Sequence, residues 1–262
     1  MKKIIQFFFK PVKGKTPLIR VIVNFLLATG ALVAFFWFSL YLVGVKLNFQ
    51  FIVEFRMRIW KGFLLTMCLS AVSLLVSLTI GVLSAMGQES RFLLLRYLSR
   101  IYVTFIRGTP LIVQIYLFFY IVGTAWGIEN RFLAGVLILS LFEGAYIAEI
   151  VRGSLITLDK TQLEAARAVG FNPSQTVRFV ILPQMIACTL PGLTGQFASI
   201  IKDSSLLSMI AVIELTQTMR EISASNYKLF ECYFFLGLLY LCLTLPVSFI
   251  SQQLERRFGY EH

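Results

Sequence analysis

Long uncharged runs, separated by short charged connections, make up most of the chain. A helix needs about 20 mostly apolar residues to cross a bilayer, so each of these runs is long enough to form a membrane span. Five runs qualify, namely 21–45, 62–88, 108–128, 179–201 and 232–254. A sixth apolar stretch, 131–150, is interrupted by Glu143 and Glu149.

The pattern predicts six spans and an all-α fold. In lipid a helix satisfies all of its own backbone hydrogen bonds, so a polytopic membrane helix bundle follows from these runs. The composition agrees, because 14% charged residues is well below the quarter that is typical of soluble domains. We expect the spans at about 20–45, 62–87, 99–122, 131–150, 185–212 and 229–251.

The net charge of +11 reflects topology rather than nucleic-acid binding. With a cytoplasmic N-terminus, fifteen Lys and Arg residues fall on cytoplasmic segments and seven on outer segments. This excess is the positive-inside bias, and it predicts that both termini are cytoplasmic. The basic N-terminus is expected to precede a retained first helix, because the apolar run after it has 25 residues and that of a signal peptide has about 7–15.

The residue inventory gives little support for catalysis or metal binding. The four cysteines are not spaced like metal ligands, and the single histidine is His262, the last residue. The tripeptide Gly14–Thr16 reads GKT, but a phosphate-binding loop also requires glycine at position 9, where the chain has Phe9. We therefore expect no catalytic residues, no cofactor and no ATP hydrolysis in this chain.

The longest polar connection, 151–183, is expected to face the cytoplasm. Asp159 or Thr161 can cap a first short helix, which Gly170 ends. Asn172 and Pro173 then restart the helix as N-cap and first position, and Pro183 marks the entry into span five. The first helix either rests on lipid headgroups or docks a protein, and the small side chains of Ala165, Ala166 and Ala168 favour docking.

The stretch "EAARAVGFNPSQTVRFVILP" resembles the EAA loop of ABC importer permeases. The pattern of that loop is E-A-A, three residues, G, nine residues, I, one residue, L-P. This chain matches it at all specified positions except Val180, which replaces isoleucine: Glu164, Ala165, Ala166, Gly170, Leu182 and Pro183. The resemblance implies a coupling helix that sits in a cleft of a partner ATPase, which would bind the ATP.

The resemblance extends over about residues 58–258 and is specifically to the polar amino acid uptake branch. It implies a five-span permease core at 58–258, preceded by an extra span within 1–57 and followed by a tail at 259–262. It also implies a bacterial plasma membrane location, a dimer of ABC ATPase subunits, a second permease that is either a copy or a homologue, and an extracytoplasmic amino-acid-binding protein. The stretches that carry it are LLTMCLSAVSLLVSLTIGVLSAM, YVTFIRGTPLIVQIYLFFY, GAYIAEIVRGSL, IIKDSSLLSMIAVIELT and LERRF.

Span three contains the first group of polar residues at membrane depth. Arg107, Gly108, Thr109 and Pro110 form an RGTP motif, and Gln114 follows one helical turn later. Glycine and proline loosen a helix and free backbone groups. These residues are candidates for a transport pathway or gate, and the alternative is a kink that neighbouring helices stabilise.

Spans four and five contain the remaining ionisable residues, which are functional candidates by default at membrane depth. Glu143 can face a pathway and pair with a cationic cargo such as arginine, or it can form an ion pair with Lys202 or Arg107 that holds the bundle together. Glu149 faces another direction, because it lies six residues further along the helix. The candidates in spans four and five are Glu143, Glu149, Lys202, Asp203 and Ser204.

The alternative hypothesis is an ion-gradient-driven secondary amino acid carrier without an ATPase partner. Such carriers often contain inverted repeats with broken helices in both halves, and we find no such symmetry in the sequence. A scaffold protein would not account for the charged residues within the spans. The sequence therefore favours the permease of an importer for polar amino acids.

Overall fold

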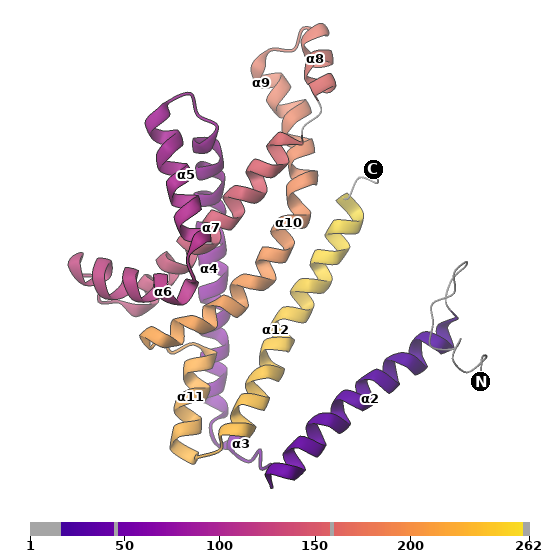
Figure 1. The fold of residues 1–262 in the computed structure, drawn as a ribbon, viewed down its shortest axis with the longest axis vertical. Coiled ribbons are helices and arrows are strands. Elements are labelled where there is room, and N and C mark those ends of the chain that lie inside the picture. The colour runs from indigo at the N-terminus through magenta and orange to yellow at the C-terminus, as the bar shows by residue number, and fades with distance from the viewer. Residues whose placement is uncertain (1–16, 45–46, 158–159, 259–262) are drawn as a thin grey trace. The chain divides into compact units, whose positions relative to one another are not determined.

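The computed structural model describes residues 17–44, 47–157 and 160–258. All regular secondary structure within these ranges is helical, as expected from the sequence (Figure 1). Five helices are long and apolar enough to cross a membrane, or six if one bent pair counts as a single span. The described chain divides into two compact units, 1–48 and 49–262.

The first unit contains a single described helix, α2 (Leu18–Val43). Its most apolar window has a mean hydropathy of 2.2, and Arg20 is its only charged residue. The helix ends at Gly44, whose φ of 74° is left-handed and therefore suits glycine. This helix corresponds to the extra first span.

The second unit contains the remaining helices. After the short α3 (Phe51–Glu54), the described part of the chain forms six longer helices and several short ones between them. The longer helices are α4 (Arg56–Gln88), α5 (Leu93–Gly108), α7 (Arg131–Ile156), α10 (Leu182–Asp203), α11 (Leu215–Asn226) and α12 (Leu229–Phe258).

Helix α7 is the centre of this unit. In its apolar window 72% of residues are buried, compared with 28% for α4. The two helices approach closely where Gly81 of α4 meets Ile147, and where Gly144 of α7 meets Ile80. A Cβ atom placed on Gly81 would lie 2.4 Å from Ile147 Cγ2. Small residues at such crossings allow helices to pack without a side chain between them.

The third span is broken rather than continuous. Helices α5 and α6 (Leu111–Tyr116, continued as a π-helix over Leu117–Gly123) meet at an angle of 115°. The break falls at Thr109 and Pro110, where the sequence predicted a kink. Proline lacks a backbone donor and disfavours helical conformation in the preceding residue, so the helix ends there.

The polar connection folds as two short helices, α8 (Lys160–Ala168) and α9 (Pro173–Thr176). Gly170 has a φ of 85° and ends the first, while Asn172 caps the second in a reciprocal capping box with Gln175. The roles of Gly170 and Asn172 and the place of Pro173 at the first position of α9 confirm the sequence prediction. Of the two proposed caps of α8, Thr161 lies inside the helix and is not its N-cap, and Asp159 lies outside the described residues. A π-helix over Val177–Ile181 then leads into α10.

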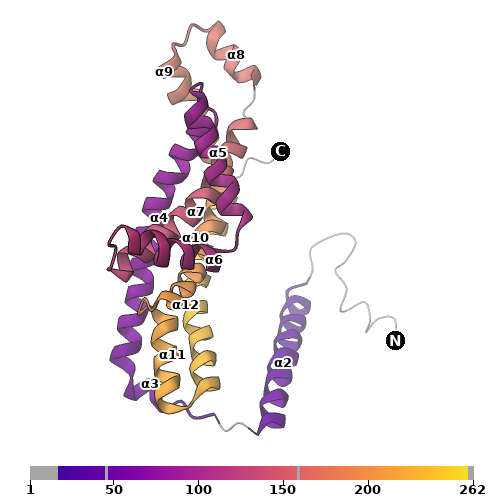
Figure 2. The same ribbon diagram turned by 60° about the vertical axis from the view of Figure 1, so that its left-hand side comes forward.

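Within the second unit, α8 and α9 lie at the end where α4 turns into α5 and α12 finishes, opposite the end that holds α3 and α11 (Figure 1, Figure 2). After α10, a 3-10 helix over Ser204–Ile210 and a turn at Ala211 lead to α11. Glu214 caps α11 by accepting hydrogen bonds from the backbone N–H groups of Thr216 and Gln217 at 2.8 Å and 2.7 Å.

Candidate functional site

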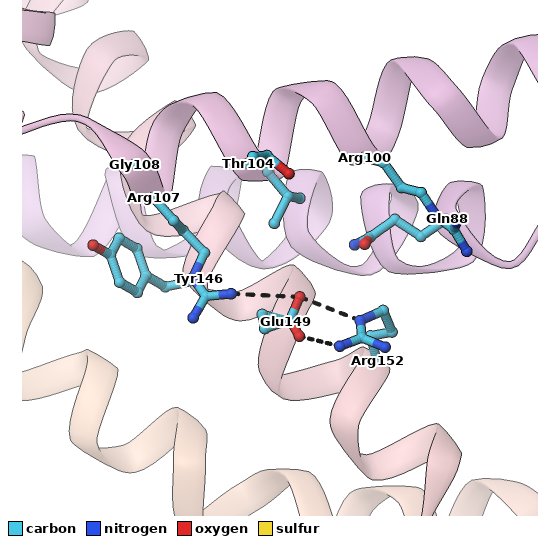
Figure 3. A pocket seen from close by; sticks show the side chains of 9 residues that line it. Gln88, Arg100, Thr104, Arg107, Gly108, Tyr146, Glu149 and Arg152 are labelled. Atoms are coloured by element: carbon cyan, nitrogen blue, oxygen red, sulfur yellow. Dashed lines mark hydrogen bonds and ion pairs between the residues drawn. The ribbon is translucent and has the colours of Figure 1, made fainter.

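A cavity of about 660 Å³ opens between α4, α5 and α7. Each helix contributes polar side chains that the close-up view shows around a common space (Figure 3). Gln88 comes from the end of α4, and the other two helices contribute stripes at helical spacing. The stripes are Arg100, Thr104 and Arg107 on α5, and Tyr146, Glu149 and Arg152 on α7.

Glu149 binds two arginines from different helices. One carboxylate oxygen accepts a hydrogen bond from Arg152 Nη2, and the other accepts one from Arg152 Nε at 3.2 Å. That second oxygen also lies 3.5 Å from Arg107 Nη1. The Arg107 guanidinium lies over the ring of Tyr146, 5.6 Å from its centroid. Arg107 is therefore held by a long ion pair and a cation–π contact, and Arg152 by a closer, two-point pair.

Glu143 lies six residues earlier on α7 in a different environment. Its side chain is fully buried, and one carboxylate oxygen accepts a hydrogen bond from Gln196 of α10. The other oxygen has no hydrogen-bond partner among the described residues. Asp203 of α10 lies close enough to interact with this carboxylate. Neither of the ion pairs considered for Glu143, with Lys202 or Arg107, occurs in the described part of the chain.

Gln114 holds the break of the third span together. It is 1% exposed, and its amide nitrogen donates to the carbonyl oxygens of Ile106 at 2.7 Å and Thr109 at 3.1 Å. It also donates to the Thr109 hydroxyl at 2.8 Å. Backbone groups that the break frees are thus satisfied inside the protein. Thr109 and Gln114 contact each other rather than the cavity, whereas Arg107 and Gly108 line it.

The three candidates around the end of α10 have separate surroundings. Lys202 is exposed, and Asp203 is partly buried near Glu143. Lys202 and Asp203 interact electrostatically. Ser204 is fully buried, and its hydroxyl donates to the carbonyl of Ile201 at 2.7 Å. Ser204 therefore satisfies its own helix, and only Asp203 joins the neighbourhood of Glu143.

The connection between spans four and five presents an exposed helix. Glu164, Ala165, Arg167 and Ala168 are exposed, so α8 has a face with two small side chains beside two opposite charges. Ala166, in contrast, is 6% exposed, and its carbonyl accepts the backbone N–H of Phe171 at 3.0 Å. The expected face of three alanines is therefore wrong in one respect, because Ala166 packs inside the turn. Pro183 is exposed in the first turn of α10.

Comparison with known proteins gives consistent relatives. A family model described as binding-protein-dependent transport system inner membrane component matches residues 77–260. The probable glutamine ABC transporter permease protein GlnM of Bacillus subtilis is 36% identical over 196 residues, which is 75% of this chain and 91% of that protein. The glutamine transport system permease protein GlnP of Escherichia coli is 35% identical, with the same two coverages. The chain belongs to this family of ABC importer permeases.

Solved structures support the same assignment. A chain in the crystal structure of an amino acid ABC transporter with histidines is 31% identical to this permease, with a TM-score of 0.75, and the match covers 81% of this chain and all of that one. A chain of the inward-facing MetNI methionine ABC transporter shares the fold at 17% identity, with a TM-score of 0.62. A permease of this kind is the membrane component, and the ATP of such a transporter is bound by a separate ATPase.

Sequence reasoning missed several residues that complete these polar clusters of the permease. Arg152 lies three residues after Glu149, a spacing at which helical side chains pair, so the sequence contained a signal for it. Gln88 and Arg100 join the cavity lining, and Gln196 reaches Glu143, only through tertiary packing. Glu214 was also missed, although an acidic residue directly before α11 matches the preference for N-caps.

Proposed function

We propose that this permease imports polar amino acids and is driven by a separate ATPase that docks on α8. The amino acid class rests on the relatives, whose names specify glutamine or an amino acid transporter. Binding-protein-dependent transport implies an ATPase and a binding protein as partners. In the complete transporter two permeases, either two copies or a pair of similar chains, form one pathway in the bacterial plasma membrane, and two ATPase subunits each engage one α8.

The exposed helix α8 is the observation that carries the proposal. Its outer face combines Glu164 and Arg167 with the small side chains of Ala165 and Ala168, which let another protein surface approach the backbone closely. Gly170, with its left-handed φ of 85°, sets the direction in which the chain returns to α10. A force on α8 is thus passed to α7 and α10, the two long helices on either side of it.

The end that carries α8 is assigned to the cytoplasm. The turn between α4 and α5 lies at the same end (Figure 1) and carries Arg91, Arg96 follows in the first turn of α5, and α8 itself carries Arg167. Basic residues concentrate on cytoplasmic segments of membrane proteins. We infer that the end with α11 is on the outer side and that both termini are cytoplasmic, as the positive-inside bias of the sequence predicts.

The two carboxylates of α7 receive different roles. Arg107 and Glu149 form a gate between α5 and α7. Glu149 makes one ion pair with Arg107 and one with Arg152, and the pair with Arg107 is the longer one and therefore the easier one to open. Glu143 contacts the cargo, because its unpartnered buried oxygen accepts an N–H donor. Both the side-chain amide of glutamine and the guanidinium of arginine supply such donors. Asp203 borders the Glu143 site on α10.

The test uses the permease reconstituted in lipid vesicles with its ATPase and binding protein. Glu164→Ala combined with Gly170→Asp is expected to abolish copurification of the ATPase and the stimulation of ATP hydrolysis by cargo-loaded binding protein. Glu89→Gln is the matched control, since Glu89 is an exposed carboxylate in the turn at the same end of the unit. Gly170→Asn is expected to retain most of the activity, because asparagine tolerates a positive φ.

Two results would contradict the proposal. Wild-type permease that never engages an ATPase, and that moves amino acids down an ion gradient by itself, would show a secondary carrier. Equal ATPase stimulation by the wild type and by the Glu164→Ala, Gly170→Asp variant would remove α8 from the coupling. Uptake of labelled glutamine and arginine in the same vesicles identifies the cargo.

A further inference from the structure

We propose that the cavity between α4, α5 and α7 is a binding site for an oxyanion, either a carboxylate or a phosphate. Its lining contains Arg100, Arg107 and Arg152 but a single carboxylate, that of Glu149. The site thus has more positive charge than its own acidic residue neutralises. Glu89, which lies within electrostatic range of Arg152, is the other nearby carboxylate and does not line the cavity.

An unused hydrogen-bond donor supports the same ligand chemistry. Gln88 lines the cavity, is 4% exposed, and its Nε2 has no partner within the described residues. A buried donor without an acceptor destabilises the folded state. An acceptor-rich ligand that enters the cavity removes this cost, whereas a cation would increase it.

The arginines differ in how firmly they are held, and this difference leaves donors free for a ligand. Arg152 makes a two-point contact with Glu149, while the Arg107 guanidinium is 3.5 Å from that carboxylate. Arg100 makes no ion pair in the ranges that the structure describes. Arg100 and Arg107 are therefore the available guanidinium groups, and the Thr104 hydroxyl lies between them on the same stripe.

The spacing of the stripe sets the extent of the site. Arg100, Thr104 and Arg107 follow one face of α5 over seven residues, which is about 10 Å along a helix. A single carboxylate or phosphate group cannot bridge that length at once. It binds either at Arg107 beside Glu149 or at Arg100 beside Gln88, so the cavity offers two successive positions for one anion.

Two sources of the anion share this chemistry. One is the α-carboxylate of the transported amino acid, and this source rests on the proposed function. The other is the phosphate of an anionic lipid of the cytoplasmic leaflet, which needs no transport. Guanidinium groups bind both kinds of oxyanion in the same forked geometry.

The test measures the sign of the charge in the cavity directly. In full-length permease with its cysteines replaced by serine, Thr104→Cys introduces one thiol into the lining. In nanodiscs of neutral phosphatidylcholine, a negatively charged methanethiosulfonate reagent is expected to react about tenfold faster than a positively charged one, because focused positive potential raises the local concentration of anions. Millimolar inorganic phosphate is expected to slow this reaction.

Two comparisons distinguish the sources. Protection by arginine but not by agmatine, which lacks the carboxylate, assigns the site to the cargo. Protection by phosphatidylglycerol in the nanodisc, without protection by the amino acid, assigns it to lipid. Either result supports an oxyanion site, and the reagent preference stands even if the permease never engages an ATPase.

Arg100→Gln in the Thr104→Cys background is expected to remove most of the reagent preference and the protection by phosphate. Arg91→Gln is the matched control, since Arg91 is exposed in the turn before α5 and does not line the cavity. Equal reaction rates for the two reagents, faster reaction of the cationic one, or no protection by phosphate overturns the proposal. The reagent preference is measured only on variants that elute from a size-exclusion column at the same volume as the wild type, so it reports on folded protein.

Discussion

Glu149 and Glu143 lie six residues apart on α7 and show two ways of placing a carboxylate inside a membrane bundle. Glu149 is partly exposed and has two arginine partners, one from its own helix and one from α5. Glu143 is fully buried and has one amide partner from α10, with one oxygen left unpartnered among the described residues. The better-paired carboxylate is thus the less buried one.

The two carboxylates differ in how far neighbouring charges compensate them. Glu143 has an amide partner in Gln196 and a second acidic residue, Asp203, nearby, and packing alone would not favour this arrangement, because a buried acidic group is destabilising unless it is paired. In the cluster around Glu149, by contrast, the carboxylate pairs with Arg107 of α5 and Arg152 of α7, and so connects the two helices. We infer that removal of Glu149 weakens the bundle first, whereas removal of Glu143 affects transport first.

The largest effect is expected from Glu149→Ala, which leaves Arg107 and Arg152 without their shared carboxylate. Hydrogen bonds to charged groups contribute about 1.5–3 kcal/mol, and partial exposure reduces this to about 1–2 kcal/mol. Equilibrium unfolding in mixed micelles measures the loss. In the double variant Glu149→Ala, Arg152→Ala the cost is expected to be smaller than the sum of the single costs. Additive costs would show that the pair is not coupled.

A third carboxylate, Glu214, tests whether burial alone explains Glu143. Glu214 is fully buried but accepts hydrogen bonds from two backbone N–H groups and from the Tyr240 hydroxyl at 3.0 Å. Burial nevertheless raises the pKa of Glu214 from 4.5 to about 7. The folded state therefore holds the proton to higher pH than the unfolded state, so stability falls as pH rises from about 4.5 to about 7.

Glu214→Gln removes this titration and is expected to flatten that part of the pH dependence, at a cost of about 1 kcal/mol for the weaker helix cap. The free energy of unfolding, measured for wild type and variant at pH 5 and pH 8, shows how much of the pH dependence the substitution removes. Glu221→Gln serves as control, because Glu221 is partly exposed and pairs with Arg58. An unchanged pH dependence in Glu214→Gln would assign the titration to another group.

The double substitution Glu143→Met, Gln196→Leu is expected to leave the stability unchanged or to raise it, whereas Glu149→Ala and Glu214→Gln lower it. It replaces both partners of a buried polar contact by apolar side chains, which is often neutral or stabilising, here by about 1 kcal/mol or less. Uptake in vesicles should nevertheless be lost if Glu143 contacts the cargo. A variant that is less stable yet transports normally would reverse the comparison between the two carboxylates.

The smallest effect is expected from Arg107→Lys. Lysine keeps the charge but loses the planar group that lies over Tyr146, so a loss of about 0.5–1 kcal/mol follows. Tyr146→Leu should produce the same loss and should not add to Arg107→Lys. Full additivity in unfolding experiments would mean that the ring and the guanidinium act separately.

The sequence predicted local features better than tertiary ones. Gly170, Asn172 and Pro173 end and restart helices through their own backbone preferences, and the structure places all three as expected. Five of the apolar runs lie in helices long enough to cross a membrane, and the run at 108–128 lies in α6 and the π-helix, after the break at the RGTP motif. The turn and cap signals act within about four residues, so no knowledge of the fold is needed to recognise them.

The partners of the membrane-depth residues could not be predicted in the same way. Glu143 meets Gln196 across 53 positions in the chain, and Gln88 meets the α5 stripe only because α4 and α5 pack together. The same limit applies to Ala166, whose burial depends on how the turn after α8 folds back. Helical periodicity assigns a face to a residue, but the helix that covers this face follows from the packing of the whole bundle.

The stitching of the third span by Gln114 has a mechanical consequence. Gln114 lies on α6, and its amide nitrogen contacts Ile106 on α5 and Thr109 at the break, so the two helices are joined at a fixed bend of 115°. Because the bend is rigid, a small tilt of α5 displaces the far end of α6 by a larger distance. When α5 tilts, α6 must therefore move with it as part of the same rigid unit, and the aromatic side chains of α6 change position in the bundle.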